Sequence, residues 1–222
     1  MMAYRLVIKK DKDIEKYLYS IGIHFKRYPL WPVFKILYIP TLSPKEKETI
    51  SRIDGVSLEL EEETTHFGQD EPFGDQSEVP IVLAHPLGVE IGLLDAGVAD
   101  KYESRAYVRQ DKASQNPSHG TFIASRFWTD NKLHSAPGAY VRSCVVLEDN
   151  SKDAYTLIKN IVASIEENRD VKVWNLSLSV AKNIEKNCFS IFAQVLDYLQ
   201  QKYAIIIFKT AANDFDFQAK TL

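Results

Sequence analysis

The stretch that decides the fold reads GLLDAGV and spans residues 92–98. An apolar run ends there on Asp95, and a glycine follows two residues later. Short apolar runs that alternate along a chain with helical periodicity are typical of buried parallel strands. We therefore predict a strand over residues 89–95. Its carboxyl end is the position at which open α/β sheets place functional groups, which makes Asp95 a candidate site residue.

Residues 81–222 continue this alternation. Further strands are predicted over 140–147, 171–176 and 204–208, and helical periodicity covers 121–128, 154–165 and 188–199. Such an order predicts an α/β fold, a parallel sheet with helices on both faces. Residues 102–109 read as a loop or edge segment with no assigned role.

The first sixty residues follow a different order, β-α-β-β-α-β, which predicts a ferredoxin-like α+β domain. Ser43, Pro44 and Glu46 fit the cap, first position and capping box of its second helix. Charge separates this part from the rest, with 11 Lys and Arg against seven Asp and Glu, whereas residues 61–78 hold seven acids and no Lys or Arg. We predict three units: a ferredoxin-like domain (1–60), an acidic linker (61–80) and the α/β domain (81–222).

Composition disfavours several classes of partner. The net charge is −3 and 45% of residues are hydrophobic, so a globular core is expected, without the basic field that nucleic acid or an anionic membrane would require. No run of about 18 apolar residues occurs, which predicts no membrane span. The N-terminus lacks the pattern of a signal peptide, so we expect a soluble cytoplasmic protein.

The sequence also argues against metals and cofactors. Both cysteines, Cys144 and Cys188, lie among apolar residues, which favours buried free thiols over a disulfide or a reactive thiol. The histidines outside the candidate site show no metal-ligand spacing and no G-x-G-x-x-G motif occurs, so we expect no metal and no cofactor. The histidines in question are His24, His66, His85 and His134.

Two further stretches complete a chemical set with Asp95. His119 lies in SHGTFIA (118–124) at the start of a predicted helix, and Asn213 follows the predicted strand near residue 208. A buried carboxylate can hold an imidazole in the tautomer that accepts a proton from a hydroxyl. A side-chain amide can stabilise the oxyanion that forms when the hydroxyl attacks a carbonyl.

With these motifs the chain resembles a subtilisin-like serine protease, a subtilase of peptidase family S8. Asp95-Ala96-Gly97 is similar to the family's D-[ST]-G, residues 119–124 to H-G-T-x-V-A, and Ala211-Ala212-Asn213 to A-A-G-N. The APGA turn at 136–139 and NLSL at 175–178 are also similar to family elements. The resemblance covers residues 81–215; Ala96, Ala212 and the Ser179-Val180 pair depart from the pattern.

The resemblance implies roles for individual residues. Asp95 would orient His119, His119 would act as general base and then acid, and Asn213 would donate to the oxyanion. Ser177, Leu178 and Ser179 would pair with the backbone of a peptide or protein substrate. By position, the first sixty residues resemble the family's propeptide, which packs on the outer helices and places its tail in the cleft.

One element of the family pattern is missing. No G-T-S-x-A segment occurs, and the last serine is Ser190, which precedes Asn213 and falls within a predicted helix. We therefore expect an incomplete catalytic domain, a fragment that lacks its nucleophile and is inactive as it stands. The alternatives are a natural pseudoprotease or peptide-binding module, or one half of a two-chain protease.

Overall fold

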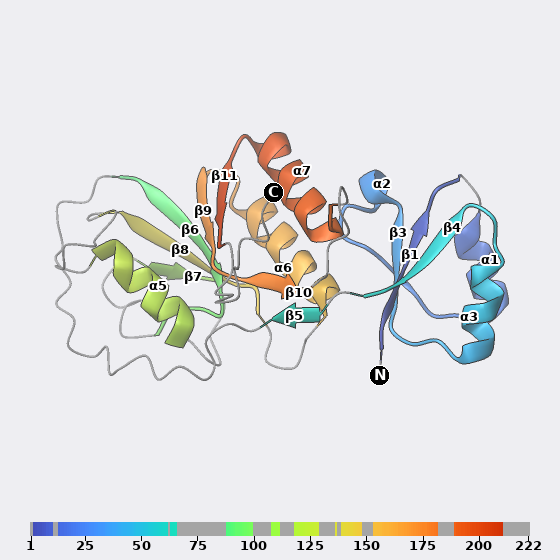
Figure 1. Cartoon of the computed structure of the whole chain (residues 1–222). Helices are drawn as coiled ribbons and strands as arrows, with labels where there is room; N and C mark the ends of the chain where they lie inside the picture. Colours follow the sequence, from blue (N-terminus) through green and yellow to red (C-terminus); the bar gives the residue numbers. More distant parts are fainter. Residues whose placement is uncertain are drawn as a thin grey trace, which may run out of the picture.

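The chain forms two main β-sheets, each packed against helices (Figure 1). The computed structural model describes residues 2–10, 13–61, 63–65, 88–99, 108–111, 118–128, 136, 139–147, 153–181 and 189–210. A third, two-stranded sheet joins segments that are far apart in the sequence. The predicted combination of an α/β sheet with an N-terminal α+β domain is confirmed.

The N-terminal part is ferredoxin-like. Its antiparallel sheet has the order β2-β3-β1-β4, and two of its helices follow the first and third strands. The predicted β-α-β-β-α-β order does not include α2, a short helix between β2 and β3. The elements are β1 (Tyr4–Ile8), α1 (Ile14–Ser20), β2 (Lys26–Arg27), α2 (Trp31–Phe34), β3 (Ile36–Ile39), α3 (Pro44–Ser51) and β4 (Val56–Leu60).

Local sequence signals set the helix boundaries in this part. The Ser43 hydroxyl accepts a hydrogen bond from the Glu46 backbone N–H at 3.3 Å, and the Glu46 carboxylate accepts one from the Ser43 N–H at 2.6 Å. The predicted capping box is therefore confirmed, with Pro44 at the first helical position. Gly22, just past α1, has a φ of +77°, as expected for a glycine that ends a helix.

The second sheet is entirely parallel and has the order β11-β9-β6-β8-β7. β6 (Glu90–Asp95) is its central strand, flanked by β8 (Tyr140–Val145) and β9 (Val173–Leu176). The outer strands are β7 (Val108–Gln110) and β11 (Ile206–Lys209). Three helices connect and cover these strands: α5 (Ser118–Trp128), α6 (Ala154–Glu167) and α7 (Ile191–Tyr203).

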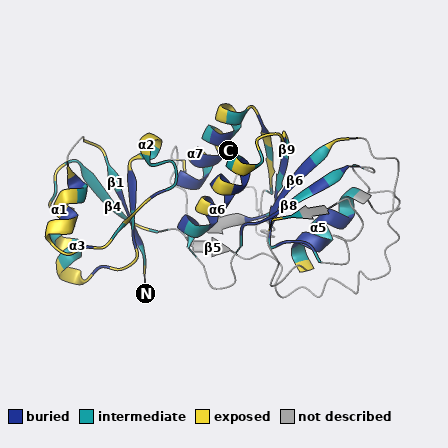
Figure 2. Ribbon diagram, turned by 180° about the vertical axis from the view of Figure 1, so that it is seen from behind, coloured by how far each residue is buried: buried dark blue, intermediate teal, exposed yellow. Residues whose placement is uncertain are grey.

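Successive residues of β6 pack in opposite directions. Leu93 joins a small core with Ala124 of α5, whereas Leu94 joins a larger core built from α6 and α7. The two faces of the sheet are thus covered by different helices, as predicted (Figures 1 and 2). On the α6 and α7 side, Gly92 leaves room for the buried ring of Trp174, because a Cβ at Gly92 would lie 2.1 Å from that ring.

The two sheets are joined through aromatic side chains. Within β3, Leu37 points into the N-terminal core, and Ile36 and Tyr38 contact the core that contains α6 and α7. The Tyr38 ring stacks on Tyr155 of α6, with 4.3 Å between ring centroids. Phe34 meets Tyr198 of α7 edge to face. The antiparallel sheet therefore lies against α6 and α7, with α1 and α3 on its other face (Figure 2).

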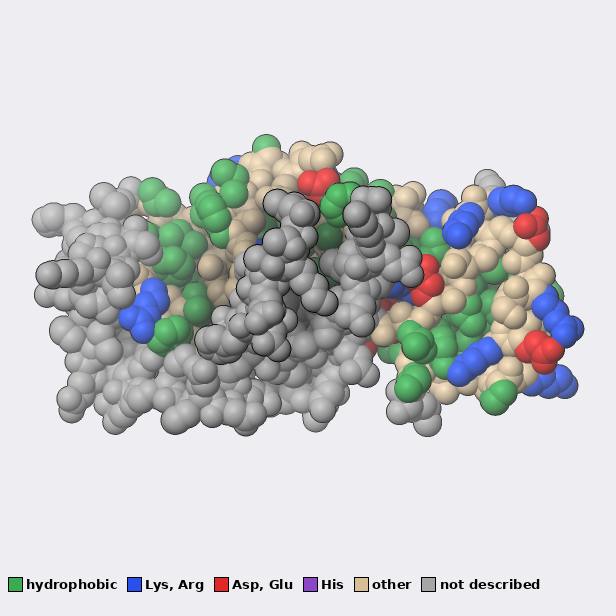
Figure 3. Space-filling view, in the orientation of Figure 1, with side chains coloured by type: hydrophobic (Ala, Val, Ile, Leu, Met, Phe, Trp, Pro, Cys, Tyr) green, Lys and Arg blue, Asp and Glu red, His purple; other side chains and the backbone are tan. Residues whose placement is uncertain are grey.

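A short two-stranded sheet follows the ferredoxin-like part. β5 (Glu63–Thr65) pairs antiparallel with β10 (Ser179–Ala181), so that Thr65 lies opposite Ser179. β5 belongs to the predicted acidic linker, whose residues 66–80 lie outside the described part. On the face shown in Figure 3, the basic side chains of the N-terminal part are scattered among acidic and apolar ones.

Candidate active site

Asp95 lies at the carboxyl end of the central parallel strand, where the sequence placed it. Its side chain is 0% exposed, and its Oδ1 accepts a hydrogen bond from the Ala96 N–H at 2.7 Å. The Asp95 carbonyl oxygen accepts a second bond from the Val146 N–H at 2.9 Å. Backbone N–H groups just after β6 and just after β8 therefore hold the side chain and the carbonyl group of Asp95 in place.

His119 reaches this carboxylate from the first turn of α5. Its Nδ1 lies 2.9 Å from both Asp95 Oδ1 and Oδ2, and its side chain is 17% exposed. Because a carboxylate can only accept, the hydrogen must sit on Nδ1, which leaves Nε2 as the proton acceptor of a neutral ring. The hydrogen bond to Asp95, helped by the carboxylate's charge, raises the pKa of His119, and partial burial opposes that rise.

Two glycines allow the pair to form. Gly97 has a φ of +100°, a conformation that side-chain-bearing residues rarely adopt. Gly120 packs on the same turn, since a Cβ at Gly120 would lie 2.1 Å from the Gly97 carbonyl oxygen and 3.2 Å from Asp95 Oδ1. The glycines after Asp95 and His119 in the two motifs thus allow β6 and α5 to approach closely.

Side chains from two neighbouring elements hold the turn after Asp95. Thr121 of α5 accepts a hydrogen bond from the Ala99 N–H at 2.9 Å through its Oγ1. Gln110 of β7 accepts one from the Val98 N–H at 2.6 Å through its Oε1. Thr121 belongs to the H-G-T motif, but sequence reasoning missed Gln110, whose only signal is a polar side chain at the end of a short edge strand.

The predicted substrate-binding residues follow β9, which ends at the same edge of the sheet as β6. The Ser177 hydroxyl donates to Asn175 Oδ1 at 2.9 Å, and Leu178 is 1% exposed in the large core. Ser179 begins β10 and pairs with Thr65. The substrate-binding role of these three residues stays a prediction.

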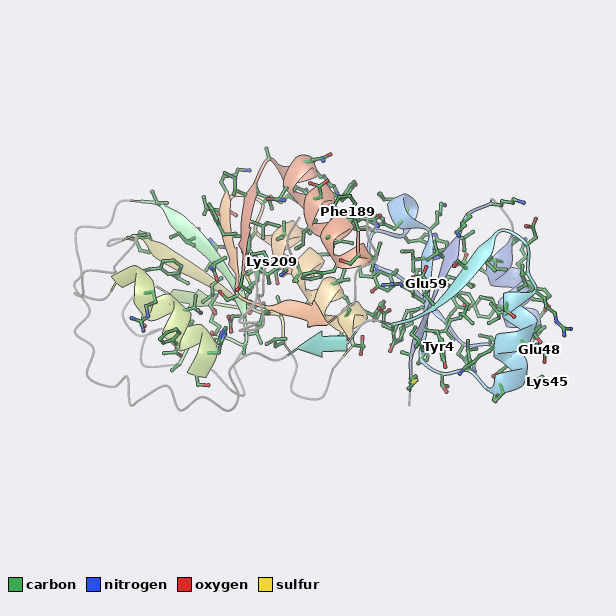
Figure 4. The ribbon with its side chains drawn as sticks, viewed as in Figure 1. Tyr4, Lys45, Glu48, Glu59, Phe189 and Lys209 are labelled. Atoms are coloured by element: carbon green, nitrogen blue, oxygen red, sulfur yellow. The ribbon has the colours of Figure 1, made fainter. Side chains whose placement is uncertain are left out.

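Asn213 lies outside the described residues, so its predicted place beside the Asp95–His119 pair stays a prediction. The described chain runs as far as Thr210, whose N–H donates to the Leu176 carbonyl oxygen at 3.2 Å. Lys209, at the carboxyl end of β11, is labelled in Figure 4.

The prediction that Ser190 lies within a helix is wrong. Ser190 is the N-cap of α7, and its hydroxyl accepts a hydrogen bond from the Ala193 N–H at 3.1 Å. The apolar residues from 188 onwards fit the helical period, so they suggested that the helix begins there. A serine whose hydroxyl accepts from a free N–H favours a helix start directly after the serine instead. Phe189 therefore precedes the helix, and its side chain is 79% exposed (Figure 4).

Cys144 is a buried free thiol, as predicted, and burial raises its pKa to about 12, so it is protonated near neutral pH. Cys188 lies outside the described residues.

In the described ranges, no three His, Cys, Asp or Glu side chains gather in a way that could hold a metal ion. None of the described helices is long and apolar enough to cross a membrane.

Comparison with known proteins gives a match in structure only. No family model and no curated protein matches the sequence. A serine-to-alanine variant of the epidermin leader peptide processing serine protease of Staphylococcus aureus superposes with a TM-score of 0.60 at 13% identity, covering 96% of this chain and 61% of that one. The same protease without the substitution gives a TM-score of 0.58. The chain thus spans about three fifths of the length of these structures, and over that span it has the fold of that serine protease.

Proposed function

We propose that this chain carries the acid–base half of a serine endopeptidase site of the subtilisin-like type. The observation that carries the proposal is the contact between the buried Asp95 carboxylate and His119 Nδ1, 2.9 Å apart at the carboxyl end of the central parallel strand. The fold shared with a serine protease at a TM-score of 0.60 supports the same chemistry.

Each candidate site residue has a definite part in this proposal. Asp95 holds the imidazole with its hydrogen on Nδ1, so that Nε2 can take the proton of a serine hydroxyl as the oxygen attacks the peptide carbonyl. The same Nε2 then gives that proton to the departing amine. Asn213, four residues after β11 in the sequence, would donate to the oxyanion of the tetrahedral intermediate.

The nucleophile is proposed to come from elsewhere. The 222 residues hold no G-T-S-x-A segment, and Ser190 is engaged as the cap of α7. We infer that a further segment or a second chain supplies the serine, and that the 222-residue chain alone does not hydrolyse peptides. A fluorophosphonate probe should leave this chain unlabelled, and labelling at any serine would contradict this part of the proposal.

The hydrogen bond between Asp95 and His119 can be tested directly. Proton NMR of the full chain should show a low-field signal from the His119 Nδ1 hydrogen, because a strong bond to a carboxylate deshields that proton and slows its exchange. Asp95→Ala should abolish the signal, and Asp197→Ala, which removes an exposed acid on α7, should leave it unchanged. Absence of the signal from the folded wild-type chain would overturn the assignment of the base.

The pairing of β5 with β10 supports peptide as the ligand class. An extended segment, Glu63–Thr65, already lies antiparallel along Ser179–Ala181, which begins with the last of the predicted substrate-binding residues. This is the backbone pairing by which an extended substrate can add to an exposed strand. We propose that β5 occupies part of the substrate path, and that the ferredoxin-like part, held on α6 and α7, acts as a propeptide-like inhibitor.

The same pairing favours the second candidate function, a pseudoprotease or binding module that holds extended peptides without cutting them. Thr64→Pro should disturb β5 and expose β10, so that a fluorescent extended peptide binds more tightly than to the wild-type chain. Thr41→Pro, in exposed coil between β3 and α3, is the matched control. Equal peptide affinity in all three proteins would argue against a peptide path along β10.

A further inference from the structure

The turn that follows Asp95 depends on the side chain of Gln110, the last residue of β7. Gln110 Oε1 accepts hydrogen bonds from the Val98 N–H at 2.6 Å and from the Ser143 hydroxyl at 3.0 Å. Val98 and Ser143 are both 0% exposed, so water cannot replace Gln110 as the acceptor without entering the core. Two buried donors therefore converge on one oxygen.

The Gln110 oxygen holds the backbone against which the first turn of α5, with His119, packs. Val98 directly follows Gly97, and the Gly97 carbonyl oxygen is the atom against which Gly120 packs. A displacement of the Val98 backbone would move that carbonyl, and with it the first turn of α5. The chain of contacts runs from β7 through the turn to the helix that presents the imidazole.

The connection between β7 and β8 makes Gln110 a rigid support. Gln110 lies opposite Ser143 in the parallel ladder, and the next residue, Asp111, accepts a hydrogen bond from the Val145 N–H at 3.0 Å. Val145 is in turn the register partner of Asp95. The end of β7 is thus tied to the carboxyl ends of both strands that border the site.

We propose that Gln110 is a positioning residue for the Asp95–His119 pair, acting through the backbone of Val98 and Gly97. This inference rests on the proposed function, in which that pair is the general base. It predicts that removing the Gln110 oxygen loosens the pair without touching either of its members.

The test compares two substitutions of nearly the same size in the full chain. Gln110→Leu removes the acceptor and should abolish or broaden the low-field signal of the His119 Nδ1 hydrogen and lower the pKa of His119 towards its ordinary value. Gln110→Glu keeps an oxygen at the same place, and it loses no bond within the described residues, because the buried Gln110 Nε2 has no hydrogen-bond partner there. Gln110→Glu should retain the signal and a raised pKa of His119.

Controls separate positioning from general destabilisation. Tyr203→Phe removes the hydroxyl that donates to Glu166 at 2.7 Å between the ends of α7 and α6, and it should lower thermal stability while leaving the His119 signal intact. If Gln110→Leu does not fold, Ser143→Ala, which removes one of the two donors, should weaken the signal in the same direction. The inference would be overturned if the folded Gln110→Leu chain kept both the signal and the pKa of His119 unchanged. If Gln110→Leu does not fold, the same result in Ser143→Ala would overturn it. A missing signal in the wild-type chain would instead overturn the proposed function.

Discussion

Gly120→Ala is the substitution for which the structure and helix propensity give opposite answers. Gly120 is the third residue of α5, and alanine in place of glycine inside a helix ordinarily stabilises by about 1 kcal/mol. Here the new Cβ would lie 2.1 Å from the Gly97 carbonyl oxygen and 3.0 Å from its carbonyl carbon. Both atoms are backbone, so α5 and the turn must move apart by roughly an ångström to reach ordinary contact.

The magnitude follows from these two effects. Forcing an extra methyl group into a packed contact costs about 1–3 kcal/mol, and the upper part of that range applies because no flexible side chain can yield. Subtracting the propensity gain of about 1 kcal/mol leaves a net loss of about 2 kcal/mol in the free energy of unfolding. The same movement separates His119 from Asp95, so the pKa of His119 should fall towards its ordinary value.

The assay is denaturant unfolding of the full chain, together with titration of the His119 imidazole by NMR. Gly22→Ala is the control, since nothing lies within 4 Å of the Cβ that it adds, although Gly22, unlike Gly120, has a positive φ. That control should lower the free energy of unfolding by about 1 kcal/mol, the strain of a left-handed alanine, and leave the pKa of His119 unchanged. If Gly120→Ala were as stable as the wild type, or kept the raised pKa of His119, the close approach of α5 to the Asp95 turn would be refuted.

Three further predictions concern stability. The Asp95–His119 pair should stabilise the fold fully below pH 6.5 and progressively less as pH rises through the raised pKa of His119. The free energies of unfolding of the wild type and of His119→Gln should therefore converge at higher pH. Ser190→Ala should lower the free energy of unfolding by about 1 kcal/mol, and Ser190→Asp should restore it, because either serine or aspartate can cap α7. Tyr155→Ala should lower the free energy of unfolding by about 3 kcal/mol, since it removes the ring on which Tyr38 stacks. The substitution should also expose Tyr38 to quenchers of its fluorescence. An unchanged Tyr38 signal would contradict the packing of the two sheets.

The parts of this fold that the sequence predicted are those that local physics determines. The central strand was predicted because an apolar run of the right length ends on Asp95, and the start of α3 because Ser43, Pro44 and Glu46 satisfy its first backbone groups. His119 was predicted because the glycine and threonine after it form a recognisable motif. In each case the signal lies within a few residues of the feature that it specifies.

The parts that the sequence did not predict depend on partners distant along the chain. Gln110 owes its role to Val98, 12 residues away, and to Ser143, 33 residues away. β5 exists because Glu63–Thr65 meets Ser179–Ala181, and neither segment has the alternation of a strand that folds by local preference. The error over Ser190 has a local cause, since the apolar residues at 188 and 189 fit the helical period and concealed the cap.

These contacts bear on how an acid–base pair can be built without its nucleophile. Every described interaction that fixes the Asp95–His119 geometry comes from β6, β7, α5, the turn between residues 95 and 99, and the segment after β8. None of them requires a serine near Nε2. The described contacts therefore orient the imidazole without a serine hydroxyl, and the hydrogen bond to Asp95 is the largest cause of the raised pKa of His119. A serine brought to Nε2 by another segment or chain would meet a base that is already aligned, and the remaining requirement for catalysis would be its position relative to the bound peptide.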